Sequence, residues 1–149
     1  MTEHSRYVLL RHETSAGYLR PSHWDFMIEV AGALRTWALE ESPADRREIT
    51  AEQLADHRIA YLEFEGEISG GRGTVSRIDR GSYTIVRESD DDLILELRGE
   101  KLVGLALLTR CSGEPTTNES GGPQRWKFKF TSDRSAIGSA AGRGADPGE

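Results

Sequence analysis

The sequence has little of what ties a chain to an oxidising compartment or to a membrane. Its 149 residues contain a single cysteine, Cys111, so no disulfide forms within the chain. Such a chain is expected in the reducing cytoplasm. No apolar run approaches the ~20 residues that a membrane-spanning helix needs, and residues 1–4 do not begin an apolar signal segment. We therefore expect a soluble, cytoplasmic protein without a membrane partner.

Positive charge is also scarce. Nineteen Lys and Arg residues face 25 Asp and Glu residues, which gives a net charge of −6 and a pI near 5.3. Because neutralisation of phosphates dominates the binding of long duplexes, this balance argues against a protein that wraps DNA. Contact with a short nucleic-acid end stays open.

Short alternating segments make up most of the chain, and segments with helical periodicity are few. The expected strands are residues 6–12, 23–30, 34–39, 61–68, 74–78, 83–87, two within 93–108, and 125–130. Residues 79–82 are expected to form a turn, and residues 50–57 one helical turn. The pattern predicts an all-β fold, a small antiparallel β-barrel with at most one or two short helical turns. We expect a site in the mouth of this barrel, where interior His, Asp and Glu side chains lie beside apolar packing.

The chain length suits one domain. We expect residues 1–130 to form the barrel domain. Residues 131–149 are small, polar and glycine-rich, so they have no apolar periodicity that would offset the entropy of ordering. We expect them to form a disordered C-terminal tail.

The stretch from His23 to Glu29 alternates strictly between two kinds of side chain. On a strand, His23, Asp25, Met27 and Glu29 share one face, and the aromatic and aliphatic residues between them share the other. An imidazole and a carboxylate two positions apart on one face can converge on a divalent ion. A solvated outer face of an antiparallel strand makes the same pattern, so the heptapeptide alone leaves both interpretations open.

Motifs spread along the chain in one order carry a family resemblance. They are Leu10-Arg11-His12, His23-Trp24-Asp25-Phe26-Met27-Ile28-Glu29, Trp37-Ala38, Asp56-His57, Tyr61, Phe64-Glu65-Gly66, Gly73-Thr74-Val75, Asp79-Arg80-Gly81-Ser82-Tyr83, Gly99-Glu100-Lys101-Leu102-Val103-Gly104 and Trp126. Through these motifs roughly residues 6–130 resemble the 3′-phosphoesterase domain of the bacterial end-joining ligase D and its stand-alone relatives.

The resemblance implies roles for particular residues. The family's manganese ligands fall on His12, His23 and Asp25, and its phosphate-contacting histidine and tyrosine fall on His57 and Tyr61. Three of the four histidines thus occupy family site positions, which favours the metal interpretation over a solvated face. Glu29 lies on the same strand face as the ligands and is a candidate to orient a metal-bound histidine.

Two departures from the family pattern concern phosphate binding. Met27 stands where the family has an arginine, and a thioether cannot replace the planar fork of a guanidinium. The loop of residues 13–22 is longer than the family's short basic loop and carries only Arg20. Arg20, Arg58 and Arg72 are candidates to replace the missing cation.

The function expected from the resemblance is that of a Mn²⁺-dependent (or other divalent-metal-dependent) 3′-phosphoesterase, a hydrolase that acts on 3′-phosphate or 3′-ribonucleotide ends in DNA repair. Two alternatives are a non-catalytic domain that binds a metal or a nucleic-acid end, and a phosphoesterase that acts on a small non-nucleic substrate. The expected partners are nucleic-acid 3′ ends and a separate ligase or polymerase in trans. We expect a monomer.

Overall fold

The computed structural model describes residues 5–14, 21–68, 72–111 and 124–133. The elements lie in the order β1 (Arg6–Glu13), β2 (His23–Val30), β3 (Ala33–Leu39), β4 (Glu48–Arg58), the 3₁₀ turn η1 (Ile59–Leu62), β5 (Gly66–Glu67), β6 (Thr74–Glu88), β7 (Asp92–Gly99), β8 (Val103–Arg110) and β9 (Gln124–Thr131). No helix among these residues is long and apolar enough to cross a membrane. The expected tail falls almost entirely outside the described residues.

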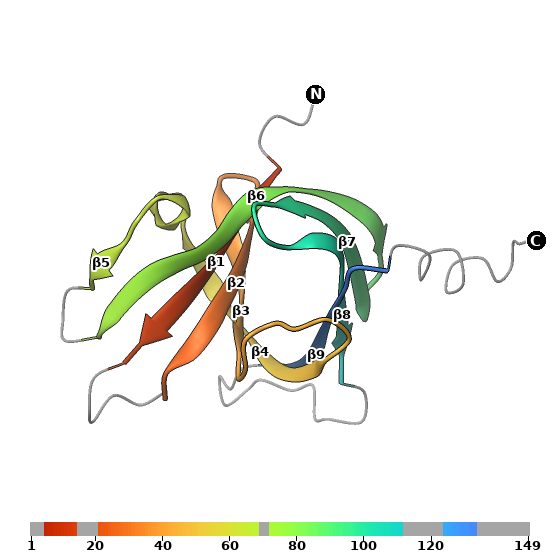
Figure 1. Ribbon diagram of the computed structural model, residues 1–149, viewed down its shortest axis with the longest axis horizontal. Helices are drawn as coiled ribbons and strands as arrows, with labels where there is room; N and C mark the ends of the chain where they lie inside the picture. The colour runs from red at the N-terminus through yellow and green to blue at the C-terminus, as the bar shows by residue number, and fades with distance from the viewer. Residues whose placement is uncertain (1–4, 15–20, 69–71, 112–123, 134–149) are drawn as a thin grey trace, which may run out of the picture.

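Eight strands close into an antiparallel barrel, which confirms the expected fold. Their order is β1-β2-β3-β4-β9-β8-β7-β6, and β6 pairs again with β1 to close the ring (Figure 1). The two central residues of the tight turn between β2 and β3, Ala31 and Gly32, both have positive φ, as a two-residue hairpin turn requires. Strand β6 is long enough to continue past the barrel, and there it pairs with β5 as well as β1.

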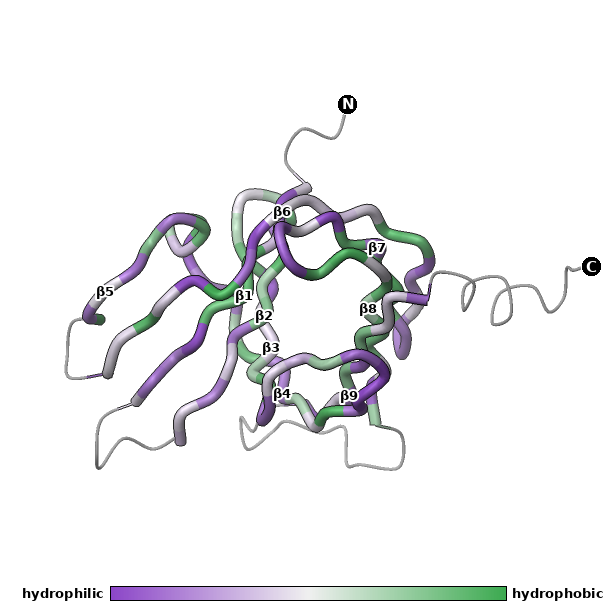
Figure 2. Tube along the Cα trace, in the orientation of Figure 1, coloured by the Kyte–Doolittle hydropathy of each residue, from purple (hydrophilic) through white to green (hydrophobic). Residues whose placement is uncertain are grey.

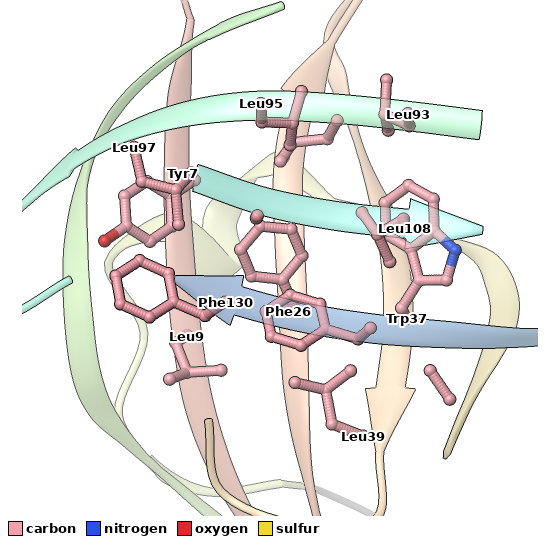
Figure 3. Close-up of a cluster of buried hydrophobic side chains, with 14 of the residues drawn as sticks. Tyr7, Leu9, Phe26, Trp37, Leu39, Leu93, Leu95, Leu97, Leu108 and Phe130 are labelled. Atoms are coloured by element: carbon pink, nitrogen blue, oxygen red, sulfur yellow. The ribbon is translucent and has the colours of Figure 1, made fainter. Parts of the chain in front are cut away.

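The barrel interior is packed with apolar side chains from all eight strands. Phe26 packs edge-on against Phe128 with ring centroids 5.2 Å apart, and Trp37 against Trp126 at 5.6 Å. Leucines of β7 and β8 pack against these rings (Figure 3). Figure 2 shows hydrophobic segments on several sides of the ring of strands, as a filled interior requires. The interior is therefore a core, and the expectation of a site among polar residues inside the barrel is wrong.

A second, smaller core covers the outer face of β1 and β2. Its buried members are Val8, Leu10, Met27, Leu34, Leu62, Ile68 and Val75. The chain from η1 to β5 passes over this face and supplies Leu62 and Ile68; in Figure 1 it lies beside the barrel at the left. Both faces of β1 and β2 are consequently buried, so the face that an isolated strand would expose to water is covered here.

Three local expectations were wrong, each because pairing with distant strands overrides local preference. Residues 50–57 belong to β4, which pairs with β3 on one side and β9 on the other, and the helical turn comes after it at η1. Much of the expected strand 61–68 is instead η1 and irregular chain. The expected turn at 79–82 lies inside β6, which continues from its pairing with β1 into its pairing with β7.

Asp79 links three parts of the barrel through its buried carboxylate. Oδ2 accepts hydrogen bonds from the Tyr7 hydroxyl at 2.5 Å and the Leu102 amide at 2.9 Å, and Oδ1 accepts one from the Lys101 amide at 2.8 Å. Burial and the hydrogen bond to Asp79 raise the pKa of Tyr7. The bonds fix the turn between β7 and β8 against β1 and β6.

We predict that Asp79→Ala destabilises the fold by roughly 3–5 kcal/mol, because it leaves a buried hydroxyl and two amides without their acceptor. Urea unfolding followed by circular dichroism measures the loss. The exposed Asp90→Ala is the matched control and should change stability by less than ~0.5 kcal/mol. Equal stability of both variants would show that the Asp79 bonds do not hold the barrel together.

Candidate metal centre and its cavity

His12, His23 and Asp25 lie together on the outer face of β1 and β2. The antiparallel register places His12 directly opposite His23, and Asp25 follows two residues later on the same face. One ligand atom from each residue lies within 4.8 Å of the other two, and all three side chains are buried. The three residues that the family resemblance assigned to a metal thus lie together, on the outer face of the barrel.

The second ring nitrogen of each histidine is held by a main-chain carbonyl. Nε2 of His12 lies 2.8 Å from the carbonyl oxygen of Arg72, and Nδ1 of His23 lies 2.8 Å from that of Pro21. Because a carbonyl only accepts, each of these nitrogens carries a proton and donates it. In the neutral rings, Nδ1 of His12 and Nε2 of His23 then present lone pairs to Asp25, at 3.6 Å from Oδ2 and 3.1 Å from Oδ1.

The carboxylate of Asp25 faces the lone pairs of both imidazoles. Its side chain is buried, and Oδ1 has no hydrogen-bond partner among the described residues. Burial raises the pKa of this carboxyl, but the hydrogen bonds that His12 and His23 donate to it when their rings are protonated lower the pKa by more, to about 2, so the group is ionised at neutral pH. A buried carboxylate facing two imidazole lone pairs suits a divalent metal ion. The residues therefore fit the metal that the family resemblance implies.

Gly73 allows the carbonyl of Arg72 to reach His12. Its φ is +100°, and a Cβ at this position would collide with the main chain of Glu13 and Thr14 at the end of β1. Only glycine allows the chain before β6 to approach β1 so closely. The carbonyls of Arg72 and Pro21 were not predicted, since a main-chain acceptor leaves no signal in the sequence beyond such a glycine.

A cavity of about 670 Å³ opens beside the cluster, between the outer face of the barrel and residues of the segment 55–68, with Arg72 also in its lining. His12 and Asp25 line it together with the apolar side chains of Leu10, Met27, Ile68 and Val75. His57 and Tyr61 also line it. The structure thus brings the five residues expected to bind metal or phosphate to one place, although only His12 and Asp25 of the metal cluster line the cavity itself.

His57 and Tyr61 form an aromatic row along the cavity. Their rings meet edge-on with centroids 5.8 Å apart, and Tyr61 meets Phe64 in the same way at 5.5 Å. Nδ1 of His57 donates to the Ala55 carbonyl at 3.0 Å, which leaves Nε2 for a bound molecule. The Tyr61 hydroxyl has no hydrogen-bond partner in the part of the chain that the structure describes.

Glu29 and Met27 occupy the same strand face as Asp25 but have different surroundings. Glu29 is buried and takes two hydrogen bonds from Arg6, at 2.9 and 3.1 Å. The contacts that orient the two histidines come instead from carbonyls. Met27 is 1% exposed and belongs to the outer core, so the cavity wall next to Asp25 is apolar where the family has a guanidinium.

Comparison with known proteins matches the model of the DNA ligase D 3′-phosphoesterase domain to residues 11–110. The multifunctional non-homologous end joining protein LigD of Pseudomonas aeruginosa is 32% identical over 131 residues, which cover 81% of this chain. Its counterpart in Mycobacterium tuberculosis, named as a DNA repair protein, is 31% identical over 106 residues, or 65% of this chain. In both cases the matched region is 14% of the relative's length, so the chain corresponds to a small part of these proteins.

The pKa of His12 provides a test of the cluster in the metal-free protein. The hydrogen bond with Asp25 raises this pKa, burial lowers it, and the bond to the Arg72 carbonyl raises it again, with a net increase. A raised pKa in the folded state stabilises the fold below the ordinary histidine pKa of ~6.5, and this contribution is lost as the pH rises through the folded-state pKa.

We predict that Asp25→Asn lowers the pKa of His12, because the amide removes the charge that favours the imidazolium while burial remains. The measurement is an NMR titration of the ring protons with EDTA present. The distant, exposed Asp90→Asn should leave the pKa where it is in the wild type. An unchanged His12 pKa in Asp25→Asn would show that the two side chains do not interact.

Proposed function

The chain belongs to the DNA ligase D 3′-phosphoesterase domain family, and we propose that it hydrolyses the phosphate ester at the 3′ end of a nucleic acid with a bound Mn²⁺ or similar divalent ion. The observation that carries this proposal is the convergence of three lone pairs beside a cavity that also presents His57 and Tyr61. His12 through Nδ1, His23 through Nε2 and Asp25 through its carboxylate would hold the ion.

Besides the metal ligands, other residues of the chain would orient the two histidines and the phosphate ester. When bound, a divalent ion supplies a Lewis acid that polarises the phosphoryl group and lowers the pKa of a water molecule. The Arg72 and Pro21 carbonyls keep the two imidazoles in the tautomers that direct lone pairs inward. Tyr61 donates its hydroxyl proton to a phosphate oxygen, which orients the ester in the cavity.

His57 is suited to protonate the leaving group. With Nδ1–H bonded to Ala55, a protonated His57 presents its Nε2–H to the cavity. In the reaction a water oxygen would form the new bond to phosphorus, and the bond between phosphorus and the 3′ oxygen would break. The proton of Nε2 would pass to the 3′ oxygen, and the protons of the water would stay on the released phosphate. The products are a 3′-hydroxyl end and inorganic phosphate.

The apolar wall next to Asp25 supports a second candidate function. With Met27 in place of a guanidinium, the domain would bind a metal and a nucleic-acid 3′ end without turnover. The acidic net charge of −6 also suits a small phosphate ester as the substrate.

We predict that His23→Ala and His57→Ala separate metal binding from chemistry. His23→Ala should weaken Mn²⁺ binding by at least about a hundredfold, because it removes one of three ligands. His57→Ala should bind Mn²⁺ like the wild type but lose roughly 10²–10⁴-fold in turnover, the contribution of a general acid. Calorimetry measures binding, and release of phosphate from a 3′-phosphorylated primer measures turnover.

The outcomes discriminate among the proposed functions. A wild-type protein that binds Mn²⁺ and the primer but releases no phosphate would be a non-catalytic domain that binds a metal and a nucleic-acid end. Turnover of a small phosphate ester without turnover of the primer indicates the small substrate. Equal Mn²⁺ affinity of the wild type and His23→Ala would contradict the proposal that His12, His23 and Asp25 form a metal centre.

A further inference from the structure

The charges that line the cavity are unevenly distributed. The wall formed by Leu10, Met27, Ile68 and Val75 carries no hydrogen-bond donor in its side chains. Besides Asp25, two further acidic residues, Asp56 and Glu67, line the cavity. A phosphate there needs positive charge beyond one divalent ion, because carboxylates near an anion are repulsive. Among the described residues that line the cavity, the arginines that can supply this charge are Arg58 and Arg72.

Of these two arginines, Arg58 is the one that lies next to His57 in the chain. It ends β4 immediately after His57, and its extended backbone, with φ −68° and ψ 143°, leads into η1. Both His57 and Arg58 line the cavity, although successive residues of a regular strand point to opposite faces. The end of the strand therefore places an imidazole and a guanidinium at one cavity.

The guanidinium of Arg58 is not used by the fold. The residue is exposed, and its side chain makes no hydrogen bond or ion pair within the described part of the chain. Other arginines of the described chain are used in this way: Arg6 pairs with Glu29, and Arg80 lies 3.2 Å from Glu100. An arginine that lines a cavity without a carboxylate partner has all five donors free for a ligand.

We propose that Arg58 is the phosphate-binding residue of this cavity, in the role that Met27 cannot fill. Its planar fork would donate two parallel hydrogen bonds to phosphate oxygens. This inference rests on the proposed function only in taking the ligand to be the phosphate of an ester. The phosphate-binding cation of this chain thus comes from the end of β4 instead of from the central strand β2.

Inorganic phosphate is the probe that tests the inference apart from turnover. Its binding is measured by calorimetry on the full chain, with and without Mn²⁺, for the wild type, Arg58→Ala, Arg58→Lys and Arg87→Ala. Arg87 is an exposed arginine of β6 that does not line the cavity, so its removal changes the net charge equally. Circular dichroism and melting curves establish that each variant is folded.

The expected result is a tenfold to hundredfold weaker phosphate affinity in Arg58→Ala, the effect of losing charge-assisted hydrogen bonds of roughly 1.5–3 kcal/mol. Arg58→Lys should recover part of the affinity, since it keeps the charge but loses the fork. Arg87→Ala should bind phosphate as the wild type does, and Mn²⁺ affinity should be equal in all four proteins.

Three results would overturn the inference. They are a wild type that binds no phosphate, an Arg58→Ala variant that binds it as well as the wild type, and an Arg87→Ala variant that loses as much affinity as Arg58→Ala. Failure of the proposed function looks different: phosphate binding would depend on Arg58, but no 3′-phosphorylated primer would be hydrolysed. In that case the proposal that Arg58 binds phosphate would hold, and the proposal that the protein hydrolyses 3′-phosphate esters would fail.

Discussion

Burial of both faces of β1 and β2 is the constraint on which the site depends. Residues such as Leu9 and Phe26 point into the barrel, and their neighbours Leu10 and Met27 pack under the chain from η1 to β5. Two-sided burial removes water from the end of this strand pair, where His12 and Asp25 lie. In such surroundings an ionised carboxylate is stable only with a cation beside it. A proton on His12 or a metal ion meets the same need, so the two compete for the site.

The packing also determines which atoms are available to a ligand. Main-chain carbonyls of Arg72 and Pro21 occupy the outward nitrogens of the two histidines, and the Ala55 carbonyl occupies one nitrogen of His57. Each ring therefore has a single nitrogen left. These tautomers follow from backbone geometry alone, in particular from the close approach that Gly73 allows. A rigid main chain thus does the orienting that a carboxylate such as Glu29 was expected to do.

Much of the fold and of the cluster could be predicted from the sequence, because period-2 alternation is a local property. It predicted β1, β2, β3, β7, β8 and β9, and it put His23 and Asp25 on one face. The sequence could not show that a second layer covers that face, since Leu62, Ile68 and Val75 come from distant segments. It could not show that β6 is continuous through residues 79–82, because pairing with β1 and then β7 decides this. The position of Arg58 depends on where β4 ends, and the expected helical turn at residues 50–57 concealed that end.

The central claim is that inward lone pairs of His12, His23 and Asp25 form one metal centre, and anomalous diffraction from crystals grown with Mn²⁺ tests it most directly. The account predicts one strong peak within coordinating distance of Nδ1 of His12, Nε2 of His23 and the Asp25 carboxylate, with both carbonyl bonds retained. A peak bound through the opposite nitrogen of either ring would contradict the account. So would manganese bound elsewhere, such as at the exposed Asp90 and Asp91, while His12, His23 and Asp25 hold none.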